Sequence, residues 1–223
     1  MNMSGHNQGD NYPRSDKFRY KLSGMLKDCL DRLSADPAQE EHIKDILRAI
    51  NNYSVQLAGA GRNNPAIAAK TAHDTIEKII LTAPEEDKKD IRCKAGCTAC
   101  CFIDASITSE EAALIVAFSR KNNIEIDQSY LIKQAETGRK DFSAVSKCVF
   151  LENDLCRIYE VRPSTCRKHF VMSDPELCDS SKNKEIPLVT YFNLQSEMVT
   201  SALMNLSTTG PIEKMLLDEL SRE

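Results

Sequence analysis

The sequence predicts a mainly α-helical protein in which a cysteine-rich, largely irregular insert interrupts a helical bundle. Three observations lead to this fold class. Apolar residues recur at helical spacing on both sides of the insert, with proline, glycine and capping residues between the helices. Strands do not alternate with helices, as an α/β fold would require. Most of the cysteines gather in a single stretch, between residues 93 and 178.

This pattern divides the chain into four parts. We expect a disordered tail over residues 1–15, N-terminal helices over 16–90, a cysteine-cluster region over 91–182, and C-terminal helices over 183–223 that pack on the N-terminal ones. The chain has 223 residues, which suits one or two domains. Its hydrophobic content of 41% is enough for an apolar core, so metal need not hold the whole fold together.

Three helices are expected before the cysteines. Residues 16–34 place their apolar side chains on one face. A second helix begins near residue 37 and is ended by a Gly-Ala-Gly sequence. Asn64 is a good N-cap and Pro65 suits the first position of a third helix, which we expect to reach about Thr82.

Further helices are expected after the first cysteines. Thr108 and Glu111 have the spacing of a capping box, which predicts a helix that runs to about Asn122. Another helix is expected over 128–137. Residues 148–180 are predicted to be irregular, with short extended pieces at 149–151 and 157–159. A long apolar stripe over 188–206 predicts a helix, and one more helix follows a Gly-Pro pair.

The cysteine-rich stretch indicates metal binding. Thiolates are soft ligands for zinc, copper(I) and iron–sulfur clusters, and thiols stay reduced in the cytoplasm. Structural disulfides are the alternative. Against them stand the polar N-terminus without a secretory pattern, the helical flanks, and the adjacent pair Cys100 and Cys101. We therefore expect a cytoplasmic protein that binds metal through reduced cysteines.

The first three cysteines, Cys93, Cys97 and Cys100, are spaced so that a loop can direct them at one centre. Neighbouring side chains usually point apart, so one of Cys100 and Cys101 is expected to serve a second centre, bridge two metals or sit beside the ligands. The distant cysteines supply the remaining ligands. The candidate metal ligands are Cys93, Cys97, Cys100, Cys101, Cys148, Cys156, Cys166 and Cys178.

The cysteines and the residues around them resemble the YkgJ-like cysteine-cluster proteins, a family of zinc- or iron-chelating domains. The resemblance covers residues 93–178. One departure is the first gap, which has three residues here where the family pattern has two. The matching motifs are Cys97-Thr98-Ala99-Cys100-Cys101, the acidic Glu111, Cys148 to Leu151, Cys156 to Tyr159, and Arg162 to Arg167.

The resemblance leaves several functions open. It implies a metal-binding protein that holds zinc or an iron–sulfur cluster. A relative, the flagellin lysine N-methylase, implies an alternative: an iron–sulfur-dependent protein methyltransferase that uses S-adenosylmethionine. A third reading is a protein-interaction module shaped by zinc. The spacing of the first three cysteines also equals that of radical S-adenosylmethionine enzymes, but the sequence shows no barrel pattern.

Charge and hydropathy limit the partners. The net charge of −4 argues against a broad phosphate-binding surface, so nucleic acid is not an expected partner. No apolar run is long enough to predict a membrane span. A protein substrate or partner stays open.

Three arginines flank the later cysteines: Arg157, Arg162 and Arg167. They either offset thiolate charge or form an anion site, since guanidinium binds carboxylates in a bidentate manner. We name Arg162 and Arg167 as candidate cofactor-binding residues.

Other polar residues have simpler interpretations. Cys29 lies on the apolar face of the first helix and is expected to pack in the core. His169 is expected to be a neighbour of the ligands rather than a ligand. His42 and His73 are expected at the surface or at its boundary.

Overall fold

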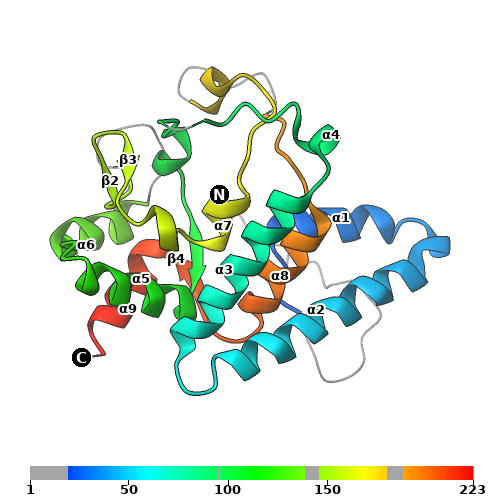
Figure 1. Ribbon diagram of the computed structural model, residues 1–223, viewed down its shortest axis with the longest axis horizontal. Helices are drawn as coiled ribbons and strands as arrows, with labels where there is room; N and C mark the ends of the chain where they lie inside the picture. The colour runs from blue at the N-terminus through cyan, green and yellow to red at the C-terminus, as the bar shows by residue number, and fades with distance from the viewer. Residues whose placement is uncertain (1–19, 95, 139–145, 180–187, 223) are drawn as a thin grey trace, which may run out of the picture.

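The computed structural model describes residues 20–94, 96–138, 146–179 and 188–222, and it is mainly helical, as predicted (Figure 1). The helices form two groups, each with its own apolar core, and the cysteine-rich loops lie at one end of the molecule. None of the helices in these ranges is long and apolar enough to cross a bilayer. The tail predicted over 1–15 lies outside the described residues.

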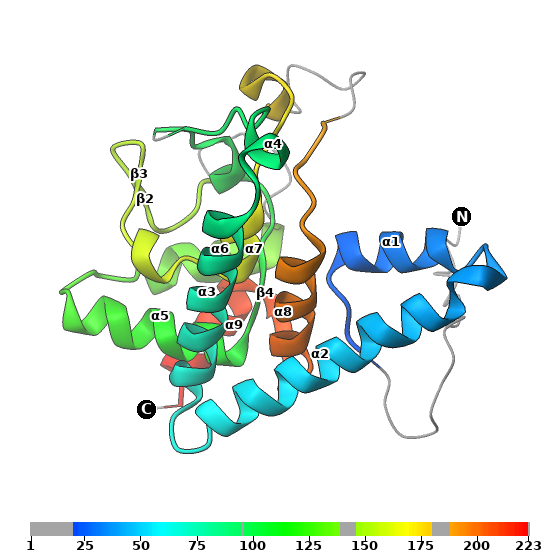
Figure 2. The same cartoon turned by 45° about the vertical axis from the view of Figure 1, so that its right-hand side comes forward.

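The first group consists of α1 (Gly24–Leu33), α2 (Glu40–Ala60), α3 (Pro65–Thr82) and α8 (Leu194–Met204). A short 3-10 turn, η1 (Pro37–Gln39), precedes α2. Helix α8 comes from beyond the cysteines, yet it packs on the three N-terminal helices (Figure 2). Burial of each aliphatic side chain contributes about 1.5–3 kcal/mol to the free energy of folding. The core of this group includes Leu26, Leu30, Ile50, Ile76, Val199 and Leu203.

The second group consists of α5 (Ser109–Lys121), α6 (Gln128–Thr137) and α9 (Ile212–Leu220). Strand β1 (Ser106–Thr108) pairs antiparallel with β4 (Thr209–Pro211) and ties α5 to α9. Helix α9 therefore packs mainly on α5 and α6, whereas we expected it to pack on the N-terminal helices. The core of this group includes Ile107, Ile115, Leu131, Phe150, Ile158 and Leu216.

Helix α3 joins the two groups, because it packs on α2 and α8 and also on α5 and α7 (Ser164–Lys168). The predicted cap is confirmed: Asn64 accepts a hydrogen bond from the backbone N–H of Ala66. The turn before it is tight. A Cβ atom at Gly61 would lie 2.7 Å from the Cβ of Ala68, so only glycine fits there without a shift.

The cysteine-rich region has little regular structure, as predicted. Its second extended piece was misplaced: the hairpin spans residues 151–156, and residues 159–161 form a 3-10 turn. The short elements just before and within it are α4 (Glu85–Lys88), η2 (Ala99–Phe102), β2 (Leu151–Glu152), β3 (Leu155–Cys156), η3 (Tyr159–Val161) and η4 (Pro175–Cys178).

Two helix starts were predicted too early. Residues 20–23 are not helical, and Ser23 occupies the N-cap position of α1. Residues 188–193 run as an extended chain before α8. There the backbone N–H of Met172 donates to Val189, and that of Tyr191 donates to Phe170. The apolar stripe that predicted a helix thus begins in a segment held by non-local backbone hydrogen bonds.

Candidate metal centre

The loop from Cys93 to Cys101 is folded by two tight turns. Gly96 has a φ of +81°, a conformation that glycine adopts without strain. The backbone N–H of Cys97 donates to the carbonyl of Lys94 at 3.0 Å, and that of Cys101 donates to Thr98 at 2.8 Å. The first four cysteines therefore lie in a compact loop that ends in η2.

A backbone hydrogen bond joins the early cysteines to the later ones. The N–H of Cys148 donates to the carbonyl of Cys101 at 2.7 Å. From there the chain turns into the β2–β3 hairpin, in which Leu151 stands opposite Cys156. Cys148 and Cys156 pack against the second core. The core thus helps to fix two of the later thiols beside the early loop.

The last two cysteines lie on other short elements. Cys166 is on α7, and Cys178 ends η4, which packs against η2. Residues beside them pair with the early loop: the N–H of Arg92 donates to the carbonyl of Val171 at 2.8 Å, and the N–H of Val171 donates to Cys93 Sγ at 3.2 Å. The segment after α7 is therefore held against the start of the loop.

One set of thiols surrounds Cys148. Burial raises the pKa of Cys166 and of Cys156, and the nearby thiols of Cys148 and Cys100 raise both further. For Cys101, the hydrogen bond with Cys100 is the largest cause of a raised pKa, followed by burial and by Cys148 and Cys156. Cys101, Cys148, Cys156 and Cys166 are thus electrostatic neighbours.

A second set surrounds Cys97. Burial raises the pKa of Cys93, and the thiols of Cys97 and Cys100 add to the effect. Burial also raises the pKa of Cys178, with further contributions from Cys97, Cys93 and Cys100. The two sets meet at Cys100, which influences members of both.

The thiols are neighbours but do not form a finished coordination shell. Within the described ranges, no three His, Cys, Asp or Glu side chains stand close enough together to hold an ion as placed. None of the cysteines in the described structure is assigned to a disulfide. The donor set nevertheless fits zinc or iron, because these eight sulfurs are soft ligands on short loop elements. The ligand roles stay predictions. Cys29 lies apart on α1, half-buried.

The arginines beside the cysteines have partners within the protein. Arg167 is buried, pairs with Glu77 on α3 and donates to the carbonyl of Glu160. The guanidinium of Arg162 lies 3.8 Å from the centre of the Tyr159 ring and 3.9 Å from Glu77. Arg162 also lowers the pKa of Cys156, although burial outweighs it. These contacts favour the interpretation in which the two arginines balance nearby negative charge within the protein. A cofactor-binding role for either arginine stays a prediction.

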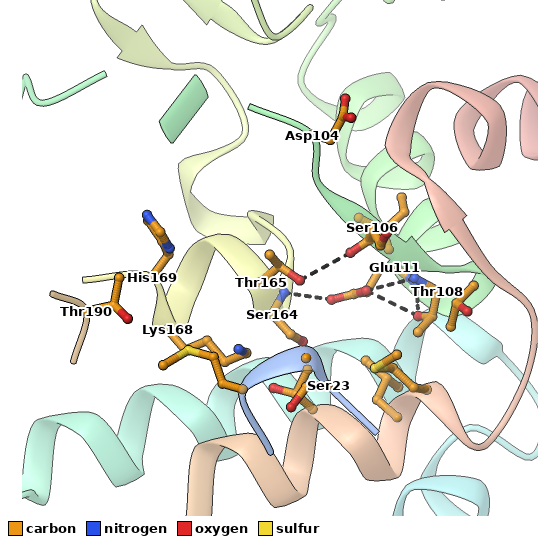
Figure 3. Close-up of a pocket in the computed structure, with 17 residues that line it drawn as sticks. Ser23, Asp104, Ser106, Thr108, Glu111, Ser164, Thr165, Lys168, His169 and Thr190 are labelled. Carbon is orange, nitrogen blue, oxygen red and sulfur yellow. Dashed lines mark hydrogen bonds between the residues drawn. The ribbon is translucent and has the colours of Figure 1, made fainter. Parts of the chain in front are cut away.

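The predicted capping box of Thr108 and Glu111 is confirmed. Glu111 also makes contacts beyond its own helix. One carboxylate oxygen accepts from the N–H of Thr108 at 2.9 Å (Figure 3). The other accepts from the N–H of Ser164 at 2.7 Å and lies 3.0 Å from Nε2 of His73. Burial opposes the charge, but these partners outweigh it and hold the pKa of Glu111 below its ordinary value.

The prediction that His73 lies at the surface or at its boundary is wrong. The residue is fully buried on α3, where it joins α3 to the starts of α5 and α7 through Glu111. The sequence did hold a signal: three alanines that are buried in the structure, Ala68, Ala69 and Ala72, precede His73 on α3, and such small side chains permit close helix packing. His169 lies at the end of α7 and lines a cavity; burial and Lys168 lower its pKa.

Comparison with known families gives one match. Residues 92–187 match the CxxCxxCC family, described as a "Putative zinc- or iron-chelating domain". The comparisons with curated proteins and with solved structures gave no match. The family description supports metal binding by the cysteine-rich segment and does not extend to S-adenosylmethionine or to a methyltransferase reaction.

Proposed function

We propose, from the match of residues 92–187 to a zinc- or iron-chelating family, that this protein holds two metal centres, each with four cysteine thiolates. The first centre takes Cys93, Cys97, Cys100 and Cys178. The second takes Cys101, Cys148, Cys156 and Cys166. The observation that carries the division is the placement of the adjacent Cys100 and Cys101.

Both residues lie in η2, a 3-10 turn. Such a turn has three residues per turn, so consecutive side chains point about 120° apart. Cys100 neighbours Cys93 and Cys178. Cys101 is hydrogen-bonded to Cys100 and also neighbours Cys148 and Cys156. Cys100 also lies near the second set, which supports two adjacent centres rather than two remote ones.

Four thiolates suit either a closed zinc site or an iron–sulfur cluster. A closed site has no position for substrate, so a structural role is the simplest one. When bound, the metals would cross-link short elements of the cysteine-rich region, in addition to backbone hydrogen bonds such as the one from Cys148 to Cys101. The function supported best is therefore metal binding that stabilises the cysteine-rich region.

Elemental analysis of protein purified without oxygen tests the proposal. We expect two zinc ions per chain, or iron with labile sulfide and visible absorption. Cys97→Ser and Cys178→Ser should each remove the metal of the first centre, and Cys156→Ser that of the second. Cys29→Ser is the control and should keep full metal content. Full metal content in all three cysteine variants would refute the ligand assignment.

Cobalt substitution gives a second measurement of the same assignment. Thiolate-to-cobalt absorption should fall by about half in Cys178→Ser and in Cys156→Ser, and should nearly vanish in the double variant. If Cys178→Ser alone removed all of the absorption, a single shared centre would replace the two proposed here.

A further inference from the structure

The two proposed metal centres differ in how firmly the rest of the protein holds their ligands. Two thiols of the second centre, Cys148 and Cys156, pack against the second apolar core. In the part of the chain that the structure describes, neither core includes a thiol of the first centre. Buried apolar contacts raise the free energy that a segment needs to open locally, so the second centre should open less often than the first.

A third ligand of the second centre, Cys166, lies on α7, which is bonded to other helices on both sides of this residue in the chain. Before it, the N–H of Ser164 donates to Glu111 on α5 at 2.7 Å (Figure 3). After it, Lys168 donates to Glu197 on α8 at 2.7 Å. A cavity of about 390 Å³ also borders α7, but none of the candidate cysteine ligands lines it, so it does not open onto this centre. A movement of Cys166 away from a metal would therefore strain or break the bonds of α7.

Cys178, a ligand of the first centre, ends a turn that is closed by local hydrogen bonds. The N–H groups of Glu176 and Leu177 both donate to Asp174, each at 3.0 Å. This turn, η4, packs chiefly on η2, which is itself a four-residue turn, whereas α7 packs on α3, α8 and β1. An outward movement of η4 would therefore disturb less of the helical structure than a movement of α7.

We propose that the first centre is an exchange site that gives its metal to a chelating acceptor, whereas the second centre retains its metal because α7 holds Cys166. This inference rests on the two centres proposed above and assigns them different roles. Cys178 departs first, and a donor atom of the acceptor takes its place. One metal–sulfur bond breaks as one bond to the acceptor forms, so the coordination number stays at four.

Chelator competition on the full chain, loaded with two cobalt ions, tests the proposal. Excess EDTA should remove the thiolate-to-cobalt absorption in two phases of similar amplitude, the first at least about tenfold faster than the second. Cys178→Ser should show only the slow phase, and Cys156→Ser only the fast one. Cys29→Ser is the control and should show both phases.

The outcomes separate this inference from the proposed function. Two ions that leave at the same rate, or a fast phase that persists in Cys178→Ser, would overturn the exchange site and leave the two centres standing. A chain that binds a single cobalt ion would overturn both.

A variant on α3 tests whether α7 retains the second ion. Arg167 of α7 is buried and pairs with Glu77, which is half-exposed, so Glu77→Gln loosens α7 without removing a metal ligand. The slow phase should become roughly two- to fivefold faster, the value of one partly exposed ion pair, while the fast phase stays unchanged. Glu41→Gln is the control and should change neither phase, since Glu41 is mostly exposed on α2 and pairs there with Arg48. Thermal unfolding would verify that both variants fold. An unchanged slow phase in Glu77→Gln, or equal acceleration of both phases, would refute retention by α7.

Discussion

Glu111 shows how much one side chain can connect in this protein. Its two oxygens bind the start of its own helix, the start of α7 and a histidine of α3. The capping box was predictable because its two partners are three residues apart. His73 and Ser164 were not, since they lie far away in the sequence and only the fold brings them to the same carboxylate.

Glu111→Gln should destabilise the protein by roughly 2–3 kcal/mol at neutral pH, because buried hydrogen bonds to a charged carboxylate are weakened or lost. Glutamine keeps the size of the side chain but loses the charge that faces His73 and the two N–H groups. Urea denaturation at pH 7 would measure the change. Glu41→Gln is the control, because Glu41 is mostly exposed and its loss should cost less than about 0.5 kcal/mol.

The difference in stability between wild type and Glu111→Gln should depend on pH. The pKa of Glu111 is lowered in the folded state, so its stabilising contribution is complete above the ordinary value of 4.5. The contribution is lost as the pH falls through the folded-state pKa, because the unfolded chain takes up the proton first. The stability gap between wild type and Glu111→Gln should therefore shrink below about pH 4.5. A gap that is constant down to pH 3 would contradict this account.

At the level of elements, local signals predicted the helices well and non-local pairing caused the errors. The caps at Asn64 and Thr108 act on backbone groups a few residues away, so sequence alone located α3 and α5. The start of α8 was misplaced because residues 189–191 pair with residues 170–173 across the fold. An apolar stripe cannot distinguish a helix from an extended segment that another segment holds in place.

The turn between α2 and α3 offers a matched pair of glycines. Gly61→Ala should destabilise the protein by about 1–3 kcal/mol, since the new Cβ would lie 2.7 Å from Ala68. Gly59→Ala should instead stabilise it by about 0.5–1 kcal/mol, because Gly59 lies within α2 and its Cβ would meet nothing within 4 Å. Thermal unfolding of both variants checks the opposite signs. Equal changes would mean that the turn can shift to admit the methyl group.

For the candidate site, the sequence predicted that the bound group is a metal, but it did not predict how the cysteine thiols are arranged around it. Thiols at such density predict metal through their chemistry alone. The division into two sets depends on which loops lie side by side, and that is decided by hydrogen bonds such as those of Val171 with Arg92 and Cys93. The cavity beside α7 had no sequence signal, because its wall residues come from segments at both ends of the chain.

At the level of the whole molecule, metal removal should act unevenly. Residues 148–179 have few regular elements, whereas α2 and α8 share an apolar core of their own. Hydrogen exchange with and without chelator should show a selective loss of protection over 148–179, with little change in α2 and α8. Uniform loss along the chain would mean that metal holds the whole fold. No loss would mean that metal does not link the two groups of cysteines.

Helix α7 has a consequence for how this protein can be divided. Within five residues it sends Arg167 to Glu77 on α3 and Lys168 to Glu197 on α8. Both acidic partners lie outside the matched segment of residues 92–187. A fragment cut at those limits would carry two cations, one buried and one partly buried in the intact chain, away from their partners. Residues 92–187 are therefore not a self-sufficient domain in this protein. If they were transferred to another protein, α3 and α8, or other carboxylates in place of Glu77 and Glu197, would have to be transferred as well.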